Sequence, residues 1–113
     1  MHRGEIWLIN LDPTIGAEIS KKRPAVIISN DVVGKLPLKV IVPITEWKDL
    51  YANVDWMVRI KPDKNNNLDK ESAADTFQVK SVSAERFVNR IGVLPIRTLD
   101  EIVEAITTVI SDI

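Results

Sequence analysis

The chain has 113 residues, with 15 lysines and arginines against 16 aspartates and glutamates, so its formal charge is −1, and it contains one histidine and no cysteine. Without cysteine and with a single histidine, the usual zinc ligand sets, cysteine nucleophiles and paired histidine acid–base catalysis are excluded. A chain of this length is expected to form one domain. Its near-zero charge argues against a protein that coats nucleic acid without sequence preference, but it is compatible with a local basic site.

The N-terminal segment predicts no secretion signal. Five residues, including an acidic one, precede the first apolar run, and no stretch approaches the about 18 apolar residues of a membrane span. We therefore expect a soluble, cytoplasmic protein.

Short runs of strand-forming residues, separated by turn signals, fill the first half of the chain. Residues 5–11 form the first predicted strand, and residues 12–16 contain the aspartate, proline and glycine that end it. The β-branched runs at 25–29 and 39–44 predict two strands that are buried on both faces or closed into a barrel.

The second half continues with strands of a more amphipathic kind. Apolar and polar residues alternate over 54–60, which predicts a half-buried strand with Trp56 on its apolar face. Further strands are predicted at 72–82 and 87–94, with one helical turn at 83–86 between them.

The C-terminal segment is predicted to be a helix. Thr98 and Glu101 form a capping-box pattern with Thr98 as the N-cap. Apolar residues then recur at three-and-four spacing and form one stripe, which comprises Leu99, Ile102, Val103, Ile106, Val109, Ile110 and Ile113. We expect this helix to pack on the sheet. Short strands without intervening helices, followed by one helix, predict a mainly β fold with a strongly bent sheet or barrel.

A basic segment, Lys21-Lys22-Arg23, leads into Pro24 and the second strand. Pro24 favours an extended backbone at Arg23, so the guanidinium is expected at the mouth of that strand, where its donors suit a phosphate. On composition alone, three such cations are more often a solvated loop. Thr45, which follows the third strand, is likewise most often structural in such a position.

Five short segments occur in a characteristic order: Arg-Gly-Glu-Ile-Trp at 3–7, Asp-Pro-Thr followed by Gly-Ala-Glu at 12–18, Arg-Pro-Ala-Val at 23–26, Val-Pro-Ile-Thr at 42–45 and Phe-Gln-Val-Lys-Ser-Val at 77–82. Together they resemble the MazF/PemK family of toxin endoribonucleases from type II toxin–antitoxin systems. The resemblance covers nearly the whole chain, so residues 1–113 are expected to be a single toxin domain.

The resemblance implies a mainly β fold, specifically a small SH3-like β-barrel of the CcdB/PemK-like kind with a C-terminal helix. It also implies a homodimer that needs no cofactor or metal and cleaves single-stranded RNA, including mRNA, at short sequence motifs. A cognate antitoxin, whose extended tail occupies the RNA groove, is the implied protein partner.

Residue roles follow from the same resemblance. Arg23 matches the family's catalytic arginine, Thr45 matches its partner, and Glu18 matches the glutamate of the Gly-x-Glu pattern. The residue before the motif glutamine is often aspartate in relatives but is Phe77 here, and Asp75 lies two positions earlier, so no role is assigned to it. We expect Phe77 in the core, with a surface for base stacking as the alternative.

The residue inventory suits a reaction in which RNA brings its own nucleophile, the ribose 2′-hydroxyl. We expect Arg23 and Thr45 to stabilise the transition state, leaving a 2′,3′-cyclic phosphate and a 5′-hydroxyl. Glu18 is the candidate base, and His2, at the N-terminus, is a weaker alternative.

Further side chains are expected to bind the RNA. Lysines can follow phosphates, and an exposed aromatic ring can stack on an unpaired base or simply pack against the protein. The expected substrate-binding set is Lys21, Lys22, Trp47, Lys48 and Gln78, whereas Trp7 and Trp56 are expected in the core.

Two other functions are compatible with such a fold. A gyrase-poison toxin would act by protein binding through the end of the helix, and an SH3-like adaptor would need clustered aromatics. The chain ends in Ser-Asp-Ile without an aromatic anchor, and its aromatic content is 5%. Because it also keeps Arg23 and Thr45, the enzyme is favoured.

Overall fold

Seven strands precede one helix in the computed structural model, which describes residues 1–32 and 36–112. The elements in chain order are β1 (Glu5–Asn10), β2 (Lys22–Ile27), β3 (Leu38–Glu46), the 3₁₀ helix η1 (Asp49–Asn53), β4 (Met57–Ile60), β5 (Ser72–Asp75), the 3₁₀ helix η2 (Thr76–Gln78), β6 (Lys80–Ser83), the 3₁₀ helix η3 (Ala84–Arg86), β7 (Phe87–Val93) and α1 (Ile96–Ile110). The predicted helical turn before β7 is therefore confirmed as η3. No helix in the described part of the chain is long and apolar enough to span a membrane.

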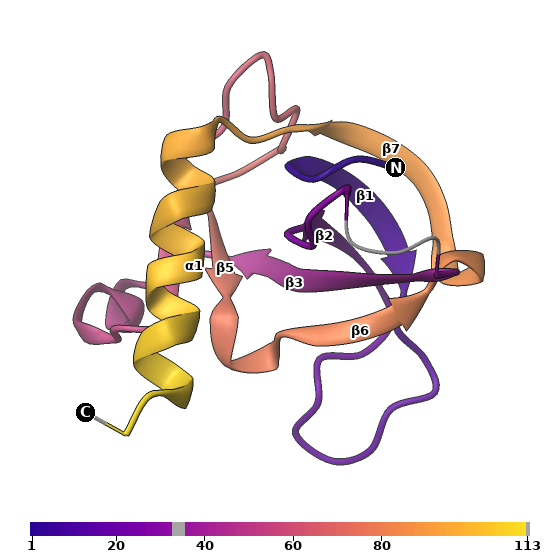
Figure 1. Cartoon of the computed structure of the whole chain (residues 1–113). Helices are drawn as coiled ribbons and strands as arrows, with labels where there is room; N and C mark the ends of the chain where they lie inside the picture. The colour runs from indigo at the N-terminus through magenta and orange to yellow at the C-terminus, as the bar shows by residue number, and fades with distance from the viewer. Residues whose placement is uncertain (33–35, 113) are drawn as a thin grey trace.

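The strands form one bent sheet in the order β4-β5-β3-β2-β1-β7, and β6 adds to β3. Each strand pair is antiparallel, and Figure 1 shows the sheet curling from β3 around to β7. The mainly β class with a C-terminal helix is confirmed. Within the described residues no ladder joins the end strands β4 and β7, so the expected barrel is an open, strongly bent sheet.

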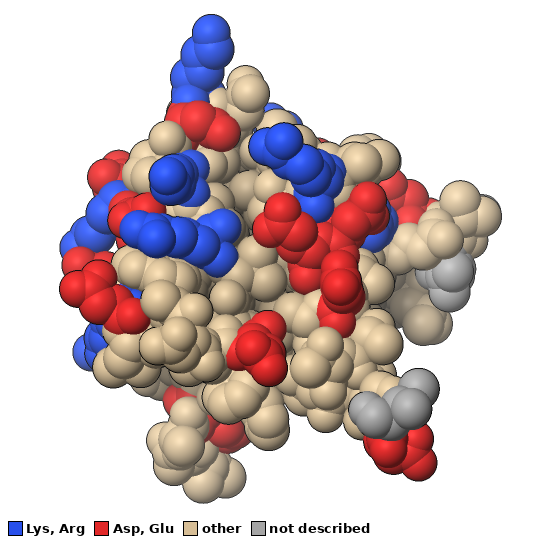
Figure 2. All heavy atoms as spheres, turned by 90° about the vertical axis from the view of Figure 1, so that its left-hand side faces the viewer, with Lys and Arg blue, Asp and Glu red and all other residues tan. Residues whose placement is uncertain are grey.

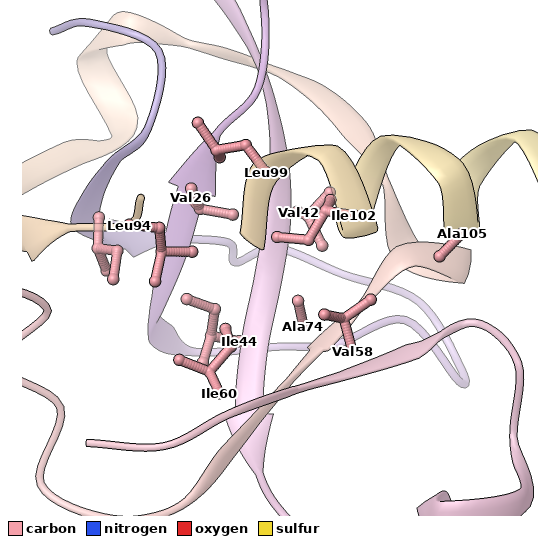
Figure 3. Packing of buried hydrophobic residues seen from close by; sticks show 11 residues of the cluster. Val26, Val42, Ile44, Val58, Ile60, Ala74, Leu94, Leu99, Ile102 and Ala105 are labelled. Atoms are coloured by element: carbon pink, nitrogen blue, oxygen red, sulfur yellow. The ribbon is translucent and has the colours of Figure 1, made fainter. Parts of the chain in front are cut away.

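The helix packs on the sheet, as expected. Leu99, Ile102 and Ala105 of α1 are buried against the sheet, where they meet Val26 of β2 and Val42 of β3 (Figure 3). This apolar cluster joins residues from most of the chain, and burial of its side chains is the main driving force for folding.

A second apolar cluster lies on the opposite face of the central strands. It contains Ile9, Leu11, Ala25, Ile27, Ile41 and Val82, with the half-buried Trp7 packed against it. Successive side chains of a strand point to opposite faces, so β2 sends Val26 to one cluster and its neighbours to the other. The expectation that β2 and β3 are buried on both faces is confirmed.

The predicted strand over 54–60 is shorter than expected, because only residues 57–60 are extended as β4. Before it, the backbone turns, and the Trp56 carbonyl accepts hydrogen bonds from Thr76 Oγ1 at 2.7 Å and from the Thr76 amide at 3.1 Å. Trp56 is 37% exposed, so its predicted place in the core is wrong. The turn leaves the ring at the surface.

The predicted strand over 72–82 runs antiparallel to β3 in two segments, β5 and β6, which η2 separates. Asp75 begins this interruption by accepting a hydrogen bond from the Phe77 amide at 3.2 Å. Because the backbone turns there, Phe77 points outward with 62% of its surface exposed. The expectation of a core Phe77 is therefore wrong.

Helix α1 begins at residue 96 with Pro95 as its N-cap and without a side-chain cap, so the predicted Thr98 cap is wrong. Pro95 is already extended, with φ −71° and ψ 160°, and proline is well tolerated where a helix begins. Of the predicted stripe, Val103 and Ile110 are 41% and 73% exposed, and Ile113 lies outside the described residues.

Candidate active site

The loop between β1 and β2, residues 11–21, delivers the predicted catalytic arginine to the start of β2. Arg23 is half-buried and pairs with Ile9 of β1, so its backbone is held in the sheet. Its side chain returns toward the loop, where Nε donates a hydrogen bond to the Ser20 carbonyl at 2.9 Å. One edge of the guanidinium is thereby fixed.

Thr45 of β3 lies at the point where β3 separates from β2, the strand that carries Arg23. The ladder between β2 and β3 has Ala25 opposite Pro43 as its last pair on this side. Continued by two residues, that register sets Arg23 opposite Thr45. Pro24 has no amide hydrogen to extend the ladder, and β3 instead pairs with β5 at Thr45.

The separated strand ends open a pocket of about 260 Å³ that contains both predicted residues. Its lining residues are Arg23, Pro24, Ile44, Thr45, Glu46, Leu68, Asp69, Lys70 and Ser72. The structure therefore brings the two most important predicted residues to one concave site. A cation with free donors and a hydroxyl at the mouth of a pocket can bind a phosphodiester.

The pocket also contains a cation that the sequence analysis missed. Lys70 lies on the segment that leads to β5, and its Nζ is 3.6 Å from Glu46 Oε2. In the sequence it belongs to a long polar stretch without a motif, so only the folding of that stretch across the pocket reveals it. Lys70 adds positive charge to the same pocket as Arg23, partly balanced by Glu46.

The other predicted residues of the loop do not line this pocket. Glu18 is exposed, and its Oε1 accepts a hydrogen bond from the Ile15 amide at 2.7 Å, which closes a turn within the loop. Lys21 and Lys22 are exposed beside Arg23, and Lys21 has a left-handed backbone with φ 70°. Neither lysine is among the residues that line the pocket.

Trp47 and Lys48 follow β3 directly, two and three residues after Thr45. The Trp47 ring meets Tyr51 edge-on at 5.8 Å between ring centres, and the Arg59 guanidinium lies 4.6 Å from the Trp47 centroid. Arg59 in turn donates from Nε to Glu71 Oε1 at 2.7 Å. Trp47 is therefore half-buried and held by these neighbours, and Lys48 is exposed.

Gln78 contacts the β1–β2 loop rather than the pocket. Its Nε2 donates to the Ala17 carbonyl at 3.2 Å, and its Oε1 accepts from the Ile19 amide at 3.3 Å. Nearby, Phe77 and Trp56 form an exposed edge-on ring pair at 5.5 Å. These two rings lie apart from the residues that line the pocket.

Figure 2 shows one face of the molecule, the left-hand side of Figure 1, where lysine and arginine side chains lie among acidic ones, mostly in the upper half of the view, and no broad field of positive charge forms. In the described part of the chain, no cluster of three or more histidine, cysteine, aspartate or glutamate residues has the arrangement of a metal site.

Residues 2–110 match the protein-family model described as the PemK-like, MazF-like toxin of type II toxin–antitoxin systems. Endoribonuclease MazF9 of Mycobacterium tuberculosis is 30% identical, covering 94% of this chain and 92% of the relative. Endoribonuclease MazF of Staphylococcus saprophyticus is 31% identical, with 94% and 88% covered.

Solved structures share the fold at lower identity. MazF from Deinococcus radiodurans superposes with a TM-score of 0.78 at 19% identity, covering 96% of this chain and 94% of that one. An endoribonuclease from a mycobacterial species in complex with its cognate antitoxin gives a TM-score of 0.76 at 16% identity, with 100% and 97% covered.

Proposed function

The chain belongs to the family of PemK-like, MazF-like toxins of type II toxin–antitoxin systems, and from this premise we propose that it cleaves single-stranded RNA at short sequence motifs without a metal ion. Full-length relatives are named endoribonucleases, so the chain is an endoribonuclease. The observation that supports the metal-free reaction is the meeting of Arg23 and Thr45 at one pocket. Cleavage of mRNA in the cytoplasm would stop translation and growth.

The proposed reaction uses the ribose 2′-hydroxyl as nucleophile. The 2′-oxygen forms a bond to phosphorus while the bond between phosphorus and the 5′-oxygen breaks. The 2′ proton passes to a base, and the departing 5′-oxygen receives a proton. The products are a 2′,3′-cyclic phosphate and a 5′-hydroxyl.

Arg23 and Thr45 would stabilise the charge that builds on the phosphate. The Arg23 Nε is engaged by Ser20, and its two terminal amino groups donate no hydrogen bond to the described residues, so they can meet two phosphate oxygens. Such an oriented donor is worth about 10² to 10³ in rate. The Thr45 hydroxyl would donate to the same phosphate.

Glu18 is the proposed base, because an arginine side chain holds its proton too tightly to accept another group's proton at neutral pH. In this structure the Glu18 carboxylate accepts the Ile15 amide hydrogen. For Glu18 to reach a 2′-hydroxyl, RNA binding must open this turn.

The RNA path would extend from the pocket over its basic neighbours. Lys21, Lys22 and Lys48 are exposed and can contact flanking phosphates, while the free edge of Trp47 can contact a base. We include Gln78 because its amide contacts the loop that carries two of these lysines.

Partners follow from the family. Solved relatives include complexes of an endoribonuclease with its cognate antitoxin and of MazE with MazF. We propose that this chain likewise forms a homodimer and is inhibited by an antitoxin whose extended segment covers the RNA site.

The test uses purified protein and a mixed-sequence single-stranded RNA, with and without EDTA. We expect cleavage in both, with a 5′-hydroxyl end and a cyclic phosphate that acid opens, and no cleavage of the same sequence with 2′-O-methyl riboses. A 3′-hydroxyl product, loss of activity in EDTA, or cleavage of the methylated strand would contradict the proposed chemistry.

A further inference from the structure

The neck of the β1–β2 loop is held by a side chain from a distant part of the chain. Arg86, the last residue of η3, donates from Nη1 to the carbonyl oxygens of Asn10 at 3.1 Å and of Asp12 at 2.6 Å. Two hydrogen bonds close the neck, where the two ends of the loop meet. The Leu11 amide donates to the Lys21 carbonyl at 3.0 Å, and the Lys21 amide donates to Asp12 Oδ1 at 2.9 Å. Arg86 therefore holds the first residues of the loop, and these residues are hydrogen-bonded to Lys21 at its other end.

The far part of the loop has a second anchor. Gln78, the last residue of η2, bridges the Ala17 carbonyl and the Ile19 amide with its side-chain amide. Ile19 is half-buried and packs against the second apolar cluster. Gln78 and Arg86 lie on either side of β6, and β6 is paired with β3. Both anchoring side chains therefore come from short helices next to the sheet, whereas the loop contains no helix or strand.

Ser20 lies between the two anchored points, Ile19 and Lys21. Its carbonyl is the group that accepts the Arg23 Nε hydrogen bond. The orientation of the guanidinium therefore depends on a peptide group that is held from both sides. The β1–β2 loop is the purple loop at the bottom of Figure 1. The hydrogen bonds of Gln78 and Arg86 link it to the two ends of β6, and that of Ser20 links it to Arg23 of β2.

We propose that Gln78 and Arg86 are positioning residues for RNA cleavage: they hold the β1–β2 loop closed, so that Ser20 presents Arg23 to the scissile phosphate. This inference rests on the proposed function. Neither anchor lines the pocket of Arg23 and Thr45, and each acts through Arg23. A displacement of about 1 Å at a catalytic group can cost about a hundredfold in rate, so loss of an anchor lowers turnover more than binding.

The kinetic test compares Arg86→Ala and Gln78→Ala with the wild-type protein on a single-stranded RNA. We expect kcat to fall about tenfold to a hundredfold while KM changes less than about threefold. Arg86→Lys, which keeps one donor, should recover part of the loss. Arg90→Ala is the matched control, because Arg90 is an arginine of the adjoining strand β7 whose side chain pairs with Glu5 instead of the loop. Wild-type kcat in both anchor variants would overturn the proposal.

Trypsin provides a readout that does not depend on RNA. The loop ends in Lys21 and Lys22, so an opened neck should be cut there more than about fivefold faster in the anchor variants than in Arg90→Ala at equal melting temperature. Equal cutting rates would overturn the proposed hold on the loop. If the wild-type protein leaves RNA intact, the proposed function fails, and the trypsin rates still decide whether the anchors close the loop.

Discussion

One hydrogen bond determines how Arg23 presents its guanidinium. With Nε bonded to the Ser20 carbonyl, the two terminal amino groups lie on the side that remains for a phosphate. An arginine fork can bind two oxygens in one plane, whereas a lysine offers a single point charge. The neighbouring Lys21 and Lys22 therefore add charge but cannot replace the geometry of Arg23.

Asp75 gives a prediction for stability. Burial raises the pKa of Asp75, and backbone hydrogen bonds from Phe77 and Gln78 offset only part of this rise. The folded protein thus binds this proton more tightly than the unfolded chain, and the free energy of unfolding falls as pH rises from about 4 through the raised pKa. The Asp75→Asn variant has no carboxyl to titrate, so its free energy of unfolding does not fall in this way, and its amide oxygen still accepts the Phe77 amide hydrogen. The melting temperature of this variant at pH 7 should therefore be a few degrees above that of wild type.

Thermal unfolding of both proteins between pH 3 and pH 7 measures this effect. The difference between Asp75→Asn and wild type should grow with pH over that range. Melting temperatures that keep a constant difference at every pH would show that the carboxyl does not carry a burial penalty.

At the scale of elements, the strands with continuous β-branched runs could be predicted from the sequence. β2 and β3 have apolar side chains on both faces, and such a run has few alternatives to a buried strand. Trp56 and Phe77 could not be placed, because alternation does not reveal where a strand ends. The hydrogen bonds of Thr76 and Asp75 turn the backbone and expose both rings.

The start of α1 gives a prediction at this scale. Thr98 lies within the first turn and Pro95 is the cap, so the hydroxyl of Thr98 is not needed to begin the helix. Thr98→Ala should change the free energy of unfolding by less than about 0.5 kcal/mol, whereas loss of a true N-cap costs about 1 kcal/mol. Denaturant unfolding measures the difference, and a loss of 1 kcal/mol or more would restore Thr98 as the cap.

At the scale of the whole molecule, the candidate site is assembled from three separate parts of the chain. Arg23 and Thr45 could be proposed from the sequence, because each belongs to a short motif, and both line the same pocket. Lys70 could not be found that way, since its role depends on the path of a polar segment over the pocket. The contacts of Gln78 and Arg86 likewise join residues 59 to 76 positions apart, which no local pattern encodes.

The charge distribution predicts how salt affects RNA binding. With a net charge of −1 and a few local cations, Lys21, Lys22, Arg23 and Lys48, the protein should neutralise about four phosphates. Affinity for a 2′-O-methyl RNA should then fall about fiftyfold between 50 and 200 mM salt, measured by fluorescence anisotropy. A fall of about a thousandfold or more would indicate a broad basic surface instead.

The central claim is that Arg23 acts with Thr45 on the scissile phosphate, and the most direct measurement is the single-turnover rate of RNA cleavage in EDTA. We expect Arg23→Ala to lower this rate by at least about 10² to 10³, Thr45→Ala to lower it less, and Thr45→Ser to retain most of it. Arg90→Ala, the control for removal of a surface arginine, should cleave at the wild-type rate. Cleavage by folded Arg23→Ala at the rate of wild type would contradict the assignment of the site.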